Sequence, residues 1–242
     1  MLRSFNTWAF KREQPSELPL MLQFIAEAVA ASEPVPFVLY WGKGPRHRAA
    51  APDVTCLDYI ATLTSRIKKA YAAGAAIKLI LTDTHAELNG HSREDIGRYF
   101  ADIEEIARQR GIGVCLMSEL VAAAGAGAAA VEPEEPSADM HARLVASAMK
   151  WYRGAGSCDD GALRYFRMNM IERRAVALAF PRAIFVTFNG HEVRGLFPRE
   201  LPIFYMYALR RGVGTKPWFL PADAVSSGET VACEPALPRA AE

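Results

Sequence analysis

The spacing of apolar and polar positions predicts alternating helices and strands along most of the chain. Apolar side chains recur at the period of an amphipathic helix in five segments: residues 16–32, 53–74, 92–111, 138–153 and 160–180. Four short apolar runs lack polar alternation, as strands do when helices cover both faces of a sheet: residues 35–41, 76–82, 113–118 and 183–189. This order predicts a Rossmann-like α/β fold, with a mainly parallel sheet flanked by helices.

Particular residue types mark the ends of the predicted helices. Ser16 is expected to cap the first helix, and Gly74 to end the second. Ser92 and Asp95 have the spacing of a capping box at the start of the third helix, which Gly111 ends. Serine and aspartate satisfy unpaired backbone N–H groups at a helix start, and glycine adopts the positive φ that often ends a helix.

Residues 1–221 are predicted to form a single α/β domain. Within it, residues 122–139 read "AAAGAGAAAVEPEEPSAD", a small, acidic and proline-bearing composition that predicts a flexible connection or a weak helix. The glycines of this segment neither follow a strand directly nor open a helix, which argues against a dinucleotide-binding loop. Residues 222–242 are rich in turn formers and are predicted to be a flexible tail.

The composition argues against several classes of protein. Of the 242 residues, 51% are hydrophobic, which is enough for a buried core, and the formal net charge of +1 provides no global field for nucleic acid or acidic lipid. The four cysteines are far apart and form no metal-binding pattern, as is typical of reduced intracellular thiols. The sequence shows neither a signal peptide nor a membrane-spanning run. We therefore expect a soluble cytoplasmic protein, able to form a homo-oligomer, without nucleic-acid or membrane partners.

Polar side chains cluster where three of the predicted strands end. The clusters are Lys43 and Arg46 in "GKGPRHR", Asp83, His85, Asn89 and His91 in "TDTHAELNGH", and Asn189, His191 and Arg194 in "TFNGHEVR". Because ligands of open α/β sheets bind at the carboxyl ends of the strands, we expect these loops to form one site. The glycines on either side of Lys43 would allow an anion to approach the backbone closely.

The same clusters are also compatible with simpler interpretations. A basic loop is most often solvated, and Asp83 can cap the following turn while His85 is a polar loop residue. Alternatively, Asp83 and His85 could share a divalent metal ion. A complete site would then need His91 or His191, and no complete metal-binding motif is present.

Two further features of the sequence favour structural roles. Glu172 and Arg173, in "RMNMIERR", lie on a predicted helix just before the fourth strand and could complete a pocket, but surface ion pairing is the simpler interpretation. Tyr99, Phe100 and Ile103 recur at helical spacing and are predicted to be core residues. A serine hydrolase is not supported, because the sequence contains no G-x-S-x-G elbow.

Several segments together carry a family resemblance. "PFVLYWGKGPR" is a strand leading to a lysine-containing loop, "PDVTCLDYIATLTSRI" is a helix opened by Pro-Asp, and "YAAGAAIKLILTDTH" is a strand ending in an aspartate loop. The pattern resumes at "AIFVTFNGH" and "GTKPWF". In this order the chain resembles the pyoverdine/dityrosine biosynthesis family, the isocyanide (isonitrile) synthases, mainly over residues 35–110. It departs from the family's usual Ser-Asp-Gly by having Thr82-Asp83-Thr84.

The resemblance implies a specific reaction. Isocyanide synthases condense the amine of an amino acid, commonly tyrosine or tryptophan, with the ketone of ribulose 5-phosphate, which supplies the isonitrile carbon without a metal or other cofactor. Lys43 and Asp83 carry over by motif match. From residue chemistry, Lys43 and Arg46 would hold a phosphate or carboxylate, while Asp83 and His85 would move protons during imine formation and fragmentation.

We therefore predict a small-molecule biosynthetic enzyme whose partners are an amino acid and a sugar phosphate. The predicted catalytic residues are Asp83, His85 and Lys43. The predicted substrate-binding residues are Arg46, Asn89, Asn189, His191 and Arg194. Two alternatives stay open: a metal-dependent hydrolase using Asp83, His85 and His91, and a non-catalytic anion-binding protein of the same fold.

Overall fold

Helices and strands alternate in the computed structural model, which describes residues 13–42, 44–129, 134–210 and 213–221. The α-helices are α2 (Leu18–Ala30), α3 (Ala51–Ala70), α4 (Asp83–Leu88), α5 (Arg93–Arg108), α6 (Met117–Ala124), α7 (Ala126–Ala129), α8 (Ala138–Trp151) and α9 (Cys158–Ala179). The strands are β1 (Val35–Trp41), β2 (Ala75–Leu81), β3 (Gly113–Leu116), β4 (Ile184–Thr187), β5 (Ile203–Tyr205), β6 (Ala208–Arg210) and β7 (Val213–Thr215). Two short 3-10 helices are η1 (His191–Leu196) and η2 (Pro217–Phe219).

Five strands form one parallel sheet in the order β3-β2-β1-β4-β5. Every neighbouring pair in this sheet is parallel, while β6 and β7 form a separate antiparallel pair. The chain adds strands outward on one side of β1 as far as β3 and then returns to the other side with β4. The predicted Rossmann-like α/β fold is therefore confirmed, and its strand order reverses between β1 and β4.

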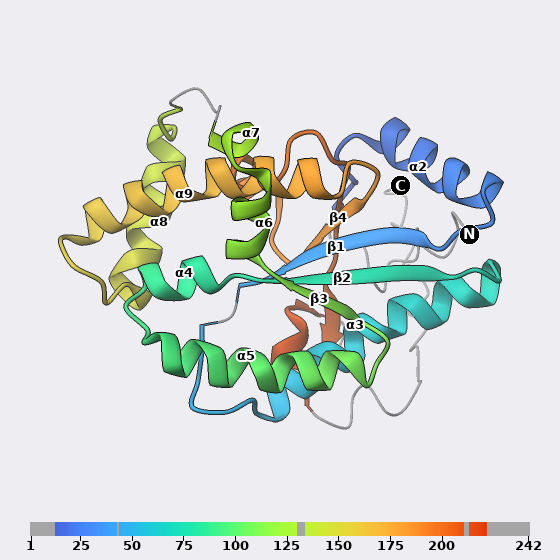
Figure 1. Cartoon of the computed structure of the whole chain (residues 1–242), viewed down its shortest axis with the longest axis horizontal. Helices are drawn as coiled ribbons and strands as arrows, with labels where there is room; N and C mark the ends of the chain where they lie inside the picture. Colours follow the sequence, from blue (N-terminus) through green and yellow to red (C-terminus); the bar gives the residue numbers. More distant parts are fainter. Residues whose placement is uncertain (1–12, 43, 130–133, 211–212, 222–242) are drawn as a thin grey trace, which may run out of the picture.

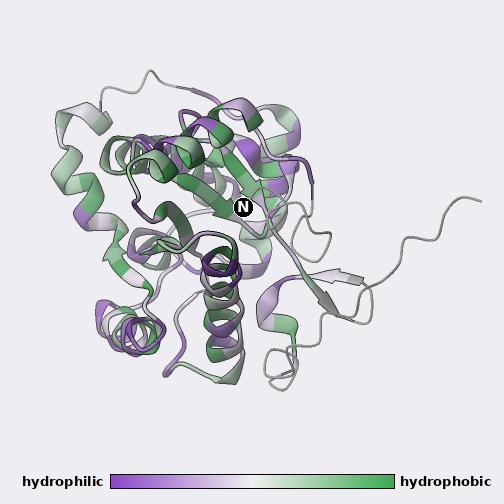
Figure 2. Ribbon diagram, turned by 90° about the vertical axis from the view of Figure 1, so that its right-hand side faces the viewer, coloured by the Kyte–Doolittle hydropathy of each residue, from purple (hydrophilic) through white to green (hydrophobic). Residues whose placement is uncertain are grey.

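Two cores cover the two faces of this sheet. Along β1, the side chains of Phe37, Leu39 and Trp41 pack in the core that α3 and α5 share, whereas Val38 and Tyr40 face the core that contains α9. Figure 1 shows α3 and α5 on one side of the strands and α6 and α9 on the other. In Figure 2 the hydrophobic colour gathers on the central strands, while the helices also carry hydrophilic stripes. Burial on both faces explains why β1 has almost no polar alternation.

The start of α2 and the end of β3 differ from the predicted boundaries. Ser16 does not cap α2. Glu17 precedes the helix with φ 53°, and the Ser16 hydroxyl instead shares a hydrogen bond with the Tyr205 hydroxyl at 2.8 Å. β3 is shorter than the strand predicted over residues 113–118, because α6 begins at Met117. Glu119 lies in the first turn of α6, where a carboxylate stabilises a helix.

The segment 122–139 contains helical turns packed on α9 rather than only a flexible connection. α6 ends at Ala124 and α7 follows, with Ala128 fully buried. A Cβ atom added at Gly127 would lie 3.3 Å from the Leu178 side chain on α9. Small residues therefore allow a close approach to α9, so the weak-helix alternative describes these turns better.

Some predictions concern residues outside the described ranges. The tail predicted over residues 222–242 and the residues 130–133 of the predicted connection belong to this group. Within the described ranges, none of the helices combines the length and the apolar character needed to cross a membrane.

Candidate functional site

The carboxyl ends of the parallel strands lie at one edge of the sheet, and each predicted polar cluster follows a strand there. α4 begins directly after β2, η1 follows β4, and the basic loop follows β1. In doubly wound sheets, ligands bind at this edge, beside the strands where the order reverses. A ligand site is therefore expected at the edge next to β1, β2 and β4.

A buried carboxylate, Glu172 on α9, lies at this edge. Its side chain is 1% exposed. The Thr84 hydroxyl donates a hydrogen bond to Glu172 Oε1, and His85 Nε2 lies 2.5 Å from Glu172 Oε2. Thr84 and His85 both come from α4, so this contact joins the loop after β2 to α9. An ionised carboxylate without partners would be very costly to bury, and these two hydrogen bonds offset that cost.

The contact between Glu172 and His85 indicates a path for a proton. A carboxylate only accepts hydrogen bonds, so beside a carboxylate at Glu172 the His85 Nε2 carries the hydrogen and donates it. The other ring nitrogen of a neutral His85, Nδ1, is then the one able to accept a proton. A carboxylate that orients an imidazole in this way is the arrangement of a general base.

Two tyrosine side chains lie beside this acid–base pair. Tyr40, on β1, has a buried hydroxyl with no hydrogen-bond partner among the described residues. Burial, followed by the nearby charge of Glu172, raises the pKa of Tyr40 well above its usual value. The same two causes raise the pKa of Tyr165, on α9, to about 12, and the Tyr165 ring meets the His85 ring edge-on with centroids 4.9 Å apart. Both hydroxyls therefore stay protonated near neutral pH and can donate hydrogen bonds.

Tyr40→Phe is expected to lower turnover about tenfold or more if the hydroxyl donates a proton to substrate. The free energy of unfolding should stay the same or rise by about 0.5–1 kcal/mol, because the substitution removes a buried hydroxyl without a described partner. Steady-state kinetics and urea unfolding measure the two effects. A Tyr40→Phe protein with wild-type turnover would remove this tyrosine from the site.

Asp83 and His85 were predicted to act together, but the structure gives them different partners. Asp83 Oδ1 accepts a hydrogen bond from the backbone N–H of Ser118 at 3.0 Å, at the start of α6, whereas His85 faces α9. Asp83 also lines an open hollow of about 650 Å³ between α4, α5, β3 and α6. Asp83 therefore anchors α4 to α6. Glu172, rather than Asp83, is the carboxylate beside His85.

The residues of the alternative metal site do not converge. The described part of the chain contains no group of three or more His, Cys, Asp or Glu side chains placed to hold a metal ion. His91 is exposed, and its Nε2 would be 3.5 Å from a Cβ added at Gly44. Asp83 and His85 have the separate partners given above. The described geometry therefore provides no support for a metal-dependent hydrolase.

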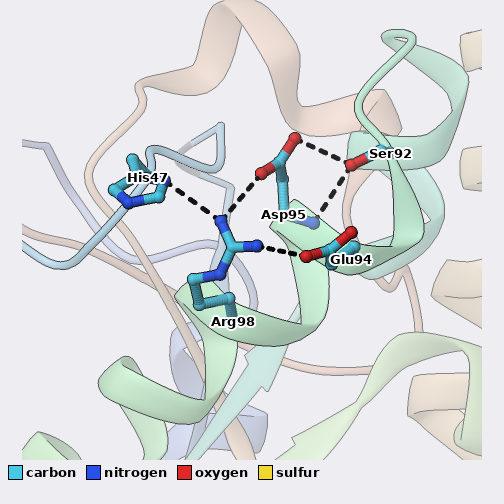
Figure 3. Close-up of polar contacts among 5 residues, drawn as sticks. All are labelled: His47, Ser92, Glu94, Asp95 and Arg98. Atoms are coloured by element: carbon cyan, nitrogen blue, oxygen red, sulfur yellow. Dashed lines mark hydrogen bonds and ion pairs between the residues drawn. The ribbon is translucent and has the colours of Figure 1, made fainter.

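Part of the basic loop after β1 is bound to α5. Arg98 Nη1 on α5 donates a hydrogen bond to His47 Nδ1 at 3.0 Å, and the same guanidinium group pairs with Glu94 and Asp95 (Figure 3). Arg48 pairs with Asp102 at 2.8 Å. Two of the loop's basic residues therefore hold the loop in place.

The predictions for the other two basic residues of this loop, Lys43 and Arg46, have different outcomes. Lys43 lies outside the described residues, so its predicted role stays a prediction. Arg46 is exposed. Its positive charge lies close enough to Tyr99 to oppose the rise in the Tyr99 pKa, which burial causes first and Asp53 second. Arg46 is thus exposed in the loop after β1, and its predicted role in substrate binding stays a prediction.

The N-terminal end of α5 confirms the predicted cap. The Ser92 hydroxyl oxygen accepts a hydrogen bond from the Asp95 backbone N–H at 3.1 Å, and the Ser92 hydroxyl donates to the Asp95 carboxylate at 2.7 Å (Figure 3). The hydrogen bond from Ser92 is the largest cause that lowers the pKa of Asp95. The cap fixes the first turn of α5, against which the basic loop is held.

The loop after β4 contains a lysine contact that the sequence did not predict. Lys216 Nζ donates a hydrogen bond to Asn189 Oδ1 at 2.7 Å and lies 5.5 Å from the centroid of the Trp218 ring. This hydrogen bond connects "AIFVTFNGH" with "GTKPWF", two segments that carry the family resemblance. Asn189 is therefore at the sheet edge as predicted, with Lys216 as a cation beside it.

The three remaining predicted binding residues are not all in one place. Asn89 ends α4, where its backbone N–H donates to the His85 carbonyl at 3.0 Å. The His191 ring stacks on Tyr205 with centroids 4.2 Å apart, and its Nε2 lies 3.4 Å from a Glu13 carboxylate oxygen. Arg194 Nη1 is 3.4 Å from the Pro198 carbonyl oxygen, which accepts its hydrogen bond. His191 thus lies beside β5, and Arg194 forms its hydrogen bond with the segment that follows η1.

Glu172 and Arg173 do not lie on the surface as predicted, although Arg173 does form an ion pair, with Glu134. They are 1% and 8% exposed, respectively, because Glu172 contacts α4 and Arg173 contacts η1. A prediction of a wider buried stripe along α9 would have included these two residues. Tyr40 was also missed, although the strand period places it on the same face as Val38.

The fold and the site define the class as a Rossmann-like α/β protein with a buried acid–base pair at the carboxyl edge of its sheet. No family model matches the sequence, and the search of curated proteins found no match. Among solved structures, the PvcA protein from Pseudomonas aeruginosa is similar. Its TM-score is 0.64 at 19% identity, and the alignment covers 90% of this chain and 85% of PvcA. The predicted resemblance is therefore confirmed at the level of the fold.

Two tyrosyl-tRNA synthetase structures are more distant. That of Leishmania major, in complex with tyrosinol, has a TM-score of 0.49 at 12% identity, covering 80% of this chain and 29% of the synthetase. That of Archaeoglobus fulgidus, complexed with L-tyrosine, has a TM-score of 0.44 at 17% identity, covering 84% and 63%. Neither likeness is large enough to support a functional argument.

Proposed function

We propose that this chain is a small-molecule biosynthetic enzyme of the isocyanide synthase type. It would condense the amine of an amino acid with the ketone of a phosphorylated keto sugar such as ribulose 5-phosphate, and the sugar carbon would become the isonitrile carbon. Its partners would be these two small molecules. The proposal is supported by the fold that the chain shares with PvcA and by the family resemblance in the sequence.

The observation that carries the proposal is the buried contact between Glu172 and His85, with Tyr40 beside it. Imine formation requires a proton to leave the attacking amine and a proton to reach the departing hydroxyl group. His85, oriented by Glu172, is suited to the first transfer, and a protonated tyrosine such as Tyr40 is suited to the second. We assign His85 the role of general base and Tyr40 the role of general acid.

Lys43 and Asp83, the two residues of the motif match, would have different roles. Lys43 would hold an anionic substrate group at the end of β1. Asp83 would act by fixing α4, which presents His85, because its carboxylate is bound to the Ser118 backbone N–H. Arg46 and Asn189 would contact substrate at the same edge.

The test is an incubation of the purified protein with amino acids and ribulose 5-phosphate labelled with ¹³C. Mass spectrometry and ¹³C NMR should detect a labelled isonitrile carbon in the product. The Glu172→Gln protein provides the matched control, since it should form little or no product. Absence of a labelled product with every amino acid tested would contradict the proposal. Binding of the sugar phosphate without turnover would favour the non-catalytic anion-binding alternative.

A further inference from the structure

A cluster of arginines surrounds one carboxylate on the α9 side of the sheet. Glu134 Oε2 accepts a hydrogen bond from Arg173 Nη2 at 2.6 Å, and Glu134 Oε1 accepts one from Arg199 Nη2. Arg173 also donates to the Gly195 carbonyl at 2.6 Å. The two guanidinium groups therefore hold one oxygen each of the same carboxylate.

The cluster has more positive charge than Glu134 neutralises. Arg194, on η1, is close enough to Arg173 and Arg199 for their charges to act on it, and it donates a hydrogen bond to the Pro198 carbonyl oxygen. Burial is the largest cause that lowers the pKa of Arg194, the charges of Arg199 and Arg173 add to it, and Tyr205 and Glu17 oppose it. Arg194 thus adds a third guanidinium group near Arg173 and Arg199, the two that bind the Glu134 carboxylate.

The exposure of these side chains increases from Arg173 in the interior to Arg199 at the surface. The Arg173 side chain is 9% exposed, that of Glu134 is 34% exposed and that of Arg199 is 56% exposed. A buried guanidinium therefore forms the floor of the cluster, and an exposed one forms its rim. Guanidinium groups arranged around an anion in this way match the several oxygens of a phosphate.

The floor of the cluster adjoins the acid–base pair. Arg173 directly follows Glu172 on α9, and its charge acts on the Tyr40 hydroxyl. Burial alone would raise the pKa of Glu134, but the hydrogen bonds from Arg173 and Arg199 outweigh it and lower the pKa. The bound carboxylate is therefore an anion at neutral pH.

We propose that Glu134 occupies a phosphate site formed by Arg173, Arg199 and Arg194, and that the phosphate of the sugar substrate displaces it. This inference rests on the proposed function, since it assigns the sugar phosphate to the arginine cluster of the same site. Glu134 is then an internal competitor. When phosphate displaces Glu134, the phosphate would contact the guanidinium group of Arg173, which lies beside Tyr40.

The experiment measures the affinity of the protein for inorganic phosphate by calorimetry. Arg199→Ala should weaken binding about ten- to a hundredfold, because it removes a charge-assisted hydrogen bond. Glu134→Gln should strengthen binding about tenfold, because a neutral amide competes less well for the two guanidinium groups. The control is Arg174→Ala, since Arg174 lies next on α9 and pairs with Glu200 on the surface. It should leave the phosphate affinity unchanged.

The opposite signs for Glu134→Gln and Arg199→Ala separate an anion site from a structural bridge. A structural bridge predicts that both substitutions lower the thermal midpoint and that neither changes phosphate affinity selectively, which would overturn the inference. If ribulose 5-phosphate is condensed but Arg199→Ala leaves its KM unchanged, the inference fails while the proposed function stands. If phosphate binds with the expected pattern but no isonitrile forms, the proposed function fails while the phosphate site stands.

Discussion

Glu172→Gln is expected to lower kcat for the proposed condensation about a hundredfold or more, the usual contribution of a positioned acid–base group. Glutamine keeps the shape of the side chain but cannot accept hydrogen bonds at both terminal atoms. One of its two partners, the Thr84 hydroxyl or His85 Nε2–H, would then face an amide N–H group in a buried position. We expect the free energy of unfolding to fall by about 1–3 kcal/mol, as for a buried donor left without an acceptor.

The control for this substitution is Glu200→Gln. Glu200 is an exposed glutamate that pairs with Arg174, also on the surface, so its loss should change neither kcat nor stability appreciably. Steady-state kinetics and urea unfolding of both variants compare the effects directly. If Glu172→Gln lost stability but kept wild-type kcat, the buried pair would be a structural contact between α4 and α9 and not part of the chemistry.

Gly90→Ala is expected to destabilise the protein more than Gly111→Ala does, and to lower turnover as well. Both glycines have positive φ, +85° and +69°. A Cβ added at Gly90 would be 2.8 Å from the Arg153 carbonyl oxygen, whereas a Cβ at Gly111 would have no heavy atom within 4 Å. Positive φ costs both variants about 1–2 kcal/mol, and the clash with a backbone oxygen adds to this at Gly90 alone.

The effect on turnover follows from the position of Gly90. It lies just after α4, which presents His85, and touches the connection between α8 and α9. Shifting this contact would change the distance between His85 and Glu172. Denaturant unfolding and kinetics of the two variants provide the measurement. Equal losses of stability for the two substitutions would show that the backbone at Gly90 can move without strain.

The local pattern of the chain was sufficient to predict most of the sheet. β1 begins and ends at the predicted residues 35 and 41, and β2 differs by one residue at each end. These strands are buried on both faces, so their apolar runs are continuous and their ends are sharp. β5 was not predicted, because its buried run, Ile203–Tyr205, has only three residues. Such a short run has no recognisable period until it pairs with β4.

The sequence by itself determined the order of helices and strands, and hence the edge at which β1, β2 and β4 present their loops. It also indicated His85, Arg46 and Asn189 at that edge. The tertiary structure alone decided what each polar group touches. Helical spacing leaves open which face of α9 packs on the sheet, so a glutamate on that helix cannot be assigned to the surface or to the core from its neighbours in sequence. Packing places Glu172 against α4, where it binds His85, and turns Asp83 toward α6. Contacts between residues as distant as His85 and Glu172 depend on how the layers pack, which local patterns do not contain.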